Sequence, residues 1–277
     1  MGIVLGLLAA VFYGSADFCG GLATKRSSMW SVTIVSQAVG FVLLFAVLPF
    51  VPGHASLNDY LWGAAAGSCG GLGLALLYHA LSIGKMGIVS PITAVLAASF
   101  PVVAGAIRGE HLSLFQGFGI AVALIAVVMI STSHDEDGKF EFKTAGVKEA
   151  VLSGLILGGF YILLARAGSH AGLYPLITAR LGSMLFLLAV ALLARQSIRP
   201  TRAALPLILI AGTIDMCANA FYVLATFQGY VSIAAVLTSL YPASTVVLAW
   251  VVLKERLQAV QYAGLLCALV GVGLIAL

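Results

Sequence analysis

Apolar runs long enough to cross a lipid bilayer dominate this chain. Each holds about 20 residues, the length a helix needs to span the hydrocarbon core, and most are separated by only a few polar, Gly or Pro residues. Of the 277 residues, 61% are hydrophobic and 9% are charged, whereas soluble domains carry about 25% charged residues. A chain with so few charged residues cannot form a water-exposed surface over all of its area. Most of the chain is therefore expected to lie in the lipid bilayer. Ten membrane-spanning helices are predicted, at residues 2–23, 30–51, 58–82, 86–107, 114–132, 147–166, 172–194, 203–226, 231–252 and 258–277.

Lysine and arginine are distributed unequally between the two sides of such a bundle. Eleven of the 14 basic residues fall in loops that follow odd-numbered spans, and two, Arg108 and Arg166, follow even-numbered spans. Because cytoplasmic loops are enriched in basic residues, this bias predicts cytoplasmic odd-numbered loops and both termini outside. The expected location is the cytoplasmic (inner) membrane of the cell. The net charge of +4 is modest and no basic tract is present, so nucleic acid is not an expected partner.

Two parts of the chain repeat each other. ITAVLAASFP at 92–101 matches IAAVLTSLYP at 233–242, EHLSLFQGFG at 110–119 matches ERLQAVQYAG at 255–264, and GLLAAVFY at 6–13 resembles GLILGGFY at 154–161. A repeat of five spans is odd, so its second copy enters the membrane from the opposite side, as in many secondary transporters. The expected fold is an all-α membrane protein with ten transmembrane helices in two inverted five-helix repeats, 1–132 and 147–277, joined by a cytoplasmic linker loop at 133–146.

These features resemble the EamA family of the drug/metabolite transporter superfamily over nearly the whole chain. The likeness rests on the two five-helix halves, the FYGSADFCGGLATKR segment of the first span, the prolines of each fourth span and the Glu-x-Leu motif at each fifth span (Pro91, Pro101, Pro242, Glu110, Leu112, Glu255 and Leu257). The resemblance implies a secondary transporter that exports a small polar or amphipathic metabolite, such as an amino acid, by alternating access. It also implies a central cavity lined by both halves, with the fifth and tenth helices packed outside it.

Arg180 and Asp215 are two ionisable residues inside predicted spans, where such groups are rare and usually functional. At about 1.5 Å per helical residue, Arg180 lies about 22 Å from the level of Arg195 and Asp215 about 20 Å from that of Arg202. The two are therefore expected to pair on consecutive antiparallel helices. Asp215 also begins a polar stripe with Asn219, Tyr222 and Thr226, at spacings of four, three and four residues. The stripe indicates either a substrate cavity or interhelical hydrogen bonding.

Asp17 is a carboxylate within the first predicted span, in the stretch GSADFCGG. It lies about 12 Å from the level of Lys25, near the bilayer midplane, with no basic residue at its own depth. Burial disfavours the charged form, so Asp17 could bind and release protons, which are candidate coupling ions. A hydrogen bond to Ser15 or Tyr13, capping of a helix break near Gly20 and Gly21, and a substrate contact are the alternatives.

Four further residues are candidates for the substrate cavity. Tyr13 and Tyr161 correspond to each other in the repeat, and Tyr78 and His79 are neighbours in the third span. Each of the four could instead be an ordinary packing residue of a helical bundle.

Several other classes of protein lack support in the sequence. Asp17 and Asp215 could form the dyad of an intramembrane protease, but their expected depths differ by about 8 Å. A passive facilitator or channel is the main alternative function, and no filter or ring of charges is present. No metal-ligand spacing, paired cysteines or nucleotide-binding loop occurs, so no cofactor is expected. The expected partners are a small-molecule substrate and lipid, and the expected oligomeric state is a monomer or weak homodimer.

Overall fold

The computed structural model describes residues 2–107, 113–131, 133–134, 140–141, 145–226, 237–238 and 240–275. These residues are almost entirely helical, as the sequence predicts. The α-helices are α1 (Gly2–Thr24), α2 (Met29–Val47), α3 (Leu57–Ile83), α4 (Met86–Ile107), α5 (Leu114–Ser131), α6 (Val147–Leu164), α7 (Pro175–Leu193), α8 (Leu205–Thr226), α10 (Tyr241–Leu253) and α11 (Ala259–Ile275). Two short 3-10 helices, Leu48–Phe50 and Ser169–Ala171, follow α2 and precede α7. In the linker region, β1 (Ser133–His134) pairs antiparallel with β2 (Phe140–Glu141).

Six of the described helices are long and apolar enough to cross a membrane. They are α1, α2 with its 3-10 extension, α3, α6, α7 and α8. Helices α4, α5, α10 and α11 contribute shorter apolar stretches of 10–17 residues. The predicted ninth span, 231–252, falls partly outside the described residues, and α10 covers its second part. The total of ten spans therefore stays a prediction.

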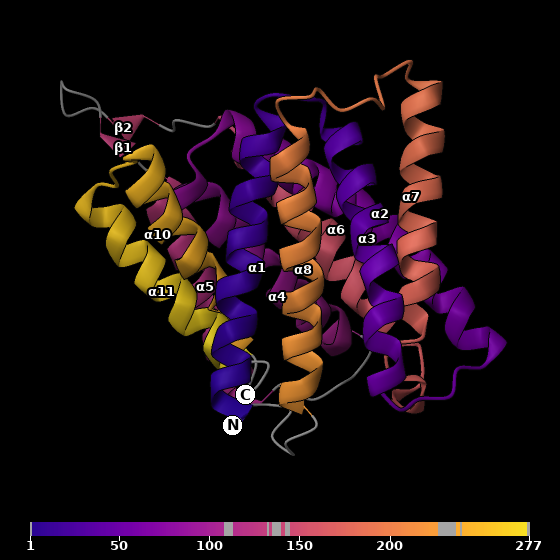
Figure 1. Cartoon of the computed structure of the whole chain (residues 1–277). Coiled ribbons are helices and arrows are strands. Elements are labelled where there is room, and N and C mark those ends of the chain that lie inside the picture. Colours follow the sequence, from indigo (N-terminus) through magenta and orange to yellow (C-terminus); the bar gives the residue numbers. More distant parts are fainter. Residues whose placement is uncertain are drawn as a thin grey trace.

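The helices form one bundle with α1 and α8 side by side near its centre (Figure 1). Helices α10 and α11 lie on one side of this pair, and α2, α3 and α7 lie on the other. Helix α5 packs against α11, and α3 packs against both α6 and α7. The start of α1 and the end of α11 lie at one end of the bundle, and the β1–β2 segment lies at the opposite end.

Helices α3 and α7 approach each other along matching small residues. A Cβ on Gly63 would meet the Pro175 carbonyl, and a Cβ on Gly67 would meet the backbone of Ala179. Gly71 lies in the same way against Ser183. Because both rows recur every four residues, the two backbones come into contact over two helical turns, as expected of small-xxx-small packing.

Buried hydroxyl groups join other helices in pairs. Ser153 of α6 donates a hydrogen bond to the Gly73 carbonyl of α3 at 2.7 Å, and Thr245 of α10 donates to the Gly14 carbonyl of α1 at 3.0 Å. Interhelical hydrogen bonds in membrane proteins contribute about 0.6 kcal/mol each on average. These contacts tie α6 and α10, from the second half of the chain, to α3 and α1 of the first half.

Glu255 links a connection of the second half to a helix of the first. Its Oε1 and Oε2 atoms accept hydrogen bonds from the backbone N–H groups of Met86 and Gly87, at 3.3 and 3.2 Å. These N–H groups belong to the first turn of α4 and have no partner within that helix, and the carboxylate also suits the positive end of the helix dipole. The related residue Glu110 lies outside the described residues.

Candidate functional site

Arg180 is the centre of a polar cluster inside the bundle. Its Nη2 atom donates to Asp215 Oδ2 at 2.7 Å, and its Nη1 atom donates to Gln37 Oε1 at 2.6 Å. The three side chains come from α7, α8 and α2 respectively. The expected pairing of Arg180 with Asp215 is therefore confirmed, whereas Gln37 was not anticipated from the sequence.

Two glycines make room for the arginine. A Cβ on Gly40 of α2 would lie 2.5 Å from Arg180 Nη1 and 2.7 Å from its Cζ, so a larger residue there would displace the guanidinium from its present position. Gly67 of α3 lies against the backbone of Ala179, the residue before Arg180. The position of Arg180 thus depends on small residues of two neighbouring helices.

The environment of the ion pair is asymmetric. The side chain of Arg180 is 9% exposed, whereas that of Asp215 is 22% exposed. Removing two charges from water is expensive, and the direct contact offsets that penalty without guaranteeing a net gain in stability. The neighbouring helices thus enclose Arg180 more completely than Asp215.

Asp17 lies on α1 without a charged partner. In the part of the chain that the structure describes, its carboxylate makes no hydrogen bond or ion pair. The hydroxyl of Ser15 donates instead to the Val11 carbonyl at 2.7 Å. Because α1 runs without interruption from Gly2 to Thr24, there is no helix break for Asp17 to cap. The structure therefore contradicts two of the structural roles considered for Asp17, the Ser15 hydrogen bond and the helix cap.

The neighbours of Asp17 along α1 show which helices surround it. Gly14, one turn earlier, lies against the Tyr241 carbonyl and Ser244 of α10. Gly20, one turn later, lies against the ring of Tyr78 from α3. The face of α1 that carries Asp17 is thus turned toward α10 and α3, and the charge of Asp17 interacts electrostatically with that of Asp215.

Most of the predicted aromatic and amide residues lie near these charges. Tyr13 interacts electrostatically with Asp215, Tyr161 and Tyr222, so these groups share one region of the bundle. Tyr78 is buried, whereas Tyr161 is 52% exposed and its ring packs edge-on against Phe160. The Nδ2 group of Asn219 donates to the Asp215 backbone carbonyl at 2.8 Å, which turns this amide along its own helix.

The structure adds two residues to the predicted substrate-cavity residues and separates a third from them. Gln37 and Tyr241 are the two additions. The sequence signal for Gln37 was a polar residue within the apolar run 30–51. Tyr241 interacts electrostatically with Asp17 and Tyr161. His79, in contrast, lines a separate pocket at the end of α3 together with Lys25 and Trp30.

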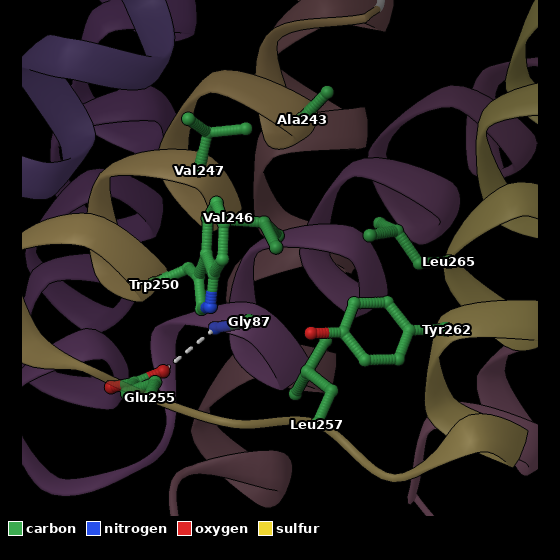
Figure 2. Close-up of a pocket in the computed structure, with 9 residues that line it drawn as sticks. All are labelled: Gly87, Ala243, Val246, Val247, Trp250, Glu255, Leu257, Tyr262 and Leu265. Atoms are coloured by element: carbon green, nitrogen blue, oxygen red, sulfur yellow. Dashed lines mark hydrogen bonds between the residues drawn. The ribbon is translucent and has the colours of Figure 1, made fainter.

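An apolar pocket of about 270 Å³ lies between α4, α10 and α11, away from the charged cluster (Figure 2). Trp250 and Tyr262 point into it from α10 and α11, and Leu257 lies below them. Glu255 lies at its edge, where it accepts the hydrogen bond from Gly87. The lining offers mostly hydrocarbon surface, so the pocket differs in chemistry from the Arg180 cluster.

The described residues contain no group of three His, Cys, Asp or Glu side chains that could hold a metal ion. All four cysteines are free thiols. The chemistry of the cluster is therefore that of charged, amide and phenol groups, which bind and orient polar molecules.

An all-helical bundle with several apolar spans and a charged cluster in its interior defines a multi-pass membrane protein. The sequence pattern of the EamA-like transporter family matches residues 1–132 and 144–277. The chain therefore belongs to the EamA-like transporter family, whose members are transporters of the drug/metabolite superfamily rather than enzymes.

Two further similarities accompany this membership. An uncharacterised protein of Methanocaldococcus jannaschii is 30% identical over 137 residues, which cover 48% of this chain and 97% of that protein. A protein of known crystal structure aligns with a TM-score of 0.61 at 12% identity, over 99% of this chain and 96% of that chain. The second similarity concerns the fold alone.

Proposed function

We propose that the protein is a secondary transporter that exports a small polar or amphipathic metabolite, such as an amino acid, by alternating access. The observation that carries this proposal is the cluster around Arg180. Its member Gln37 and the nearby Asp17 come from the first half of the chain, and Arg180 and Asp215 come from the second. A polar site between two halves of a membrane bundle is where a secondary transporter binds its substrate.

The packing of the helices supports an inverted repeat. If α1, α2, α3 and α4 are exchanged with α6, α7, α8 and α10, the contact of α1 with α8 becomes that of α6 with α3. In the same way, α2 with α8 becomes α7 with α3, and α1 with α10 becomes α6 with α4; all six contacts are formed. The two separate family matches and the half-length relative agree with two equivalent five-helix units. Such units can exchange roles between inward-open and outward-open states.

Within this site, Asp17 is the residue proposed to bind the coupling proton. It carries a carboxylate without a described partner, whereas the carboxylate of Asp215 is paired with Arg180. A proton or a cationic group of the substrate would neutralise Asp17 in the low-dielectric interior. The coupling could also be exchange, with Asp17 as a substrate contact.

The orientation is proposed from charge. With the basic loops in the cytoplasm, the 133–146 linker is cytoplasmic and both termini are outside the cell membrane. The arrangement in Figure 1 is compatible with this, because the β1–β2 segment and the start of α1 lie at opposite ends of the bundle.

A passive facilitator or channel is the second candidate function, and an intramembrane protease has less support. A protease of the aspartyl class needs two carboxyls that share a proton. In this protein, Oδ2 of Asp215 instead accepts a hydrogen bond from Arg180 Nη2 at 2.7 Å. This contact argues for a binding role of Asp215 and against a catalytic one.

Counterflow in proteoliposomes tests the proposed function. Purified protein is reconstituted and preloaded with each of the common amino acids, and entry of the labelled form is measured. We expect at least one amino acid to show saturable uptake that the internal substrate accelerates, with a loss of about tenfold or more in Arg180→Ala. Arg202→Ala, a change to an exposed arginine between α7 and α8, is the matched control. Flux without saturation and without counterflow would favour a channel.

A further inference from the structure

A second pocket lies where α1 and α3 end and α2 begins. Its volume of about 500 Å³ is within the range of small-molecule sites. The side chains that line it come from three stretches of the chain at this end of the bundle: Thr24, Lys25, Ser27, Ser28, Met29, Trp30, His79, Ser82, Ile83 and Gln196. This is the end where α1 terminates, which the distribution of basic residues assigns to the cytoplasm.

The hydroxyl groups of the lining are already used to build its walls. Ser28 donates to the Ser197 carbonyl at 2.6 Å, which ties the start of α2 to the segment after α7. Ser82 donates to the His79 carbonyl at 2.7 Å within α3. Thr24 donates to the carbonyl one turn earlier in α1. These groups fix the shape of the pocket and are not free to bind a ligand.

Most of the polar groups that remain are hydrogen-bond donors, and the amide oxygen of Gln196 is an acceptor among them. Within the described part of the chain, the Lys25 ammonium, the Trp30 indole N–H and the His79 ring make no hydrogen bond or ion pair. An ammonium and an indole only donate, and an imidazole donates from at least one nitrogen in either protonation state. None of the ten lining residues is acidic. The complement of such a lining is a group that is rich in acceptor oxygens and negatively charged.

The start of α2 adds to this preference. Met29 and Trp30 are the first residues of a 19-residue helix, and both line the pocket. The Ser28 hydroxyl already caps the N–H of Ser31, so the N–H groups of Met29 and Trp30 are the ones left without a partner in the helix, and the helix dipole favours negative charge there. Lys25, His79 and the start of α2 thus approach the same volume from three different segments.

We propose that this pocket binds a small oxyanion, a carboxylate or phosphate group, between Lys25, His79 and the start of α2. The site is distinct from the Arg180 cluster and goes beyond the proposed transport function, because it concerns ligand binding at the bundle's end. The oxyanion could belong to a free metabolite or to the phosphodiester of a lipid headgroup, and the two sources share the chemistry that the pocket recognises.

Trp30 provides a direct reporter, since it is one of only three tryptophans. The double change Trp62→Phe and Trp250→Phe leaves Trp30 as the only indole. Its fluorescence is followed in the full-length protein in detergent during titration with inorganic phosphate and with citrate, against potassium chloride at equal ionic strength. A parallel set of nanodiscs compares phosphatidylglycerol with phosphatidylcholine. Lys25→Gln and His79→Gln are the test variants, and Arg256→Gln in the α10–α11 connection is the matched control.

We expect a saturable change in Trp30 fluorescence with an oxyanion, and a midpoint about tenfold higher in Lys25→Gln, the loss expected for one charge-assisted hydrogen bond. Arg256→Gln should keep the original midpoint. Saturation by phosphate or citrate identifies a free anion, and a response to phosphatidylglycerol alone identifies a headgroup. The proposal is overturned if none of these probes gives a saturable change, if potassium chloride reproduces it, or if Lys25→Gln and Arg256→Gln have equal midpoints. Because no transport is measured, these outcomes are independent of the counterflow result.

Discussion

Asp215 Oδ2 lies 2.7 Å from Arg180 Nη2, and this ion pair connects two antiparallel helices in the interior of the bundle. The same guanidinium holds Gln37 of α2 through its other terminal nitrogen. One side chain thus links three helices, two from the second half and one from the first. A movement of α2 away from α7 and α8 would break the Arg180–Gln37 hydrogen bond and leave the ion pair with Asp215 in place.

The two members of the ion pair are expected to respond unequally to neutralisation. Asp215→Asn leaves a guanidinium on a side chain that is only 9% exposed, whereas Arg180→Gln leaves a carboxylate on one that is 22% exposed. Removing one partner of a buried pair costs about 3–5 kcal/mol. The variant that leaves the more exposed charge, Arg180→Gln, should cost less than that. Thermal unfolding in detergent should therefore show the larger loss for Asp215→Asn.

The double variant tests whether the two residues act as a pair. Combining Arg180→Gln with Asp215→Asn removes both charges, so its loss of thermal stability should be smaller than the sum of the two single losses. Additive losses in this double-mutant cycle would contradict a direct interaction.

Close packing of α3 on α7 predicts opposite effects of two glycine-to-alanine changes. In Gly67→Ala the added methyl meets the backbone of Ala179, which cannot move aside, so the variant should be clearly destabilised or inactive. Gly117→Ala in α5 meets nothing within 4 Å, and alanine should stabilise a helix interior there by about 0.5–1 kcal/mol. Thermal unfolding and counterflow of both variants provide the measurement. A neutral Gly67→Ala would show that the two backbones are further apart than described.

Asp17 is predicted to couple transport to the proton gradient. Asp17→Asn keeps the size of the side chain and removes its ability to titrate. In proteoliposomes with an imposed pH gradient, wild-type uptake should respond to the gradient, and the variant should transport without that response. If both proteins respond equally, the proton site is elsewhere.

Orientation can be tested at the linker. Ser133→Cys, in a background in which Cys19, Cys69, Cys217 and Cys267 are replaced, places one thiol in β1. A membrane-impermeant thiol reagent should label it in inside-out vesicles and leave it unmodified when added to intact cells. Ready labelling from outside would reverse the proposed topology.

Helix positions followed closely from the apolar runs, because lipid requires a continuous helix wherever the chain is apolar for about 20 residues. The span predicted at 58–82 is Leu57–Ile83, and that predicted at 86–107 is Met86–Ile107. The pairing of Arg180 with Asp215 was also predictable, since it joins consecutive antiparallel helices whose depths can be counted from their shared loop.

Contacts between helices distant in sequence could not be predicted in the same way. Gln37 reaches Arg180 from α2, and nothing in the apolar pattern specifies which way α2 turns its one amide. Glu255 belongs to the second Glu-x-Leu motif, and nothing in that motif specifies that its carboxylate binds the start of α4. Tyr78 and His79 are adjacent residues, yet successive helix positions point about 100° apart. Tyr78 therefore packs against Gly20, whereas His79 lines the pocket at the end of α3.

The glycine face of α3 has a consequence for how the protein is made. Its partner α7 is synthesised about a hundred residues later, so the ribosome releases α3 into the membrane before the surface that fits Gly63, Gly67 and Gly71 exists. Helix α1 is likewise synthesised before its packing partners α8 and α10. Until the second half is made, the first half of the nascent chain therefore lacks these contacts and has only those among its own helices. In a chain that stopped at residue 132, the packing surfaces that the second half provides could come only from a second copy of the same chain.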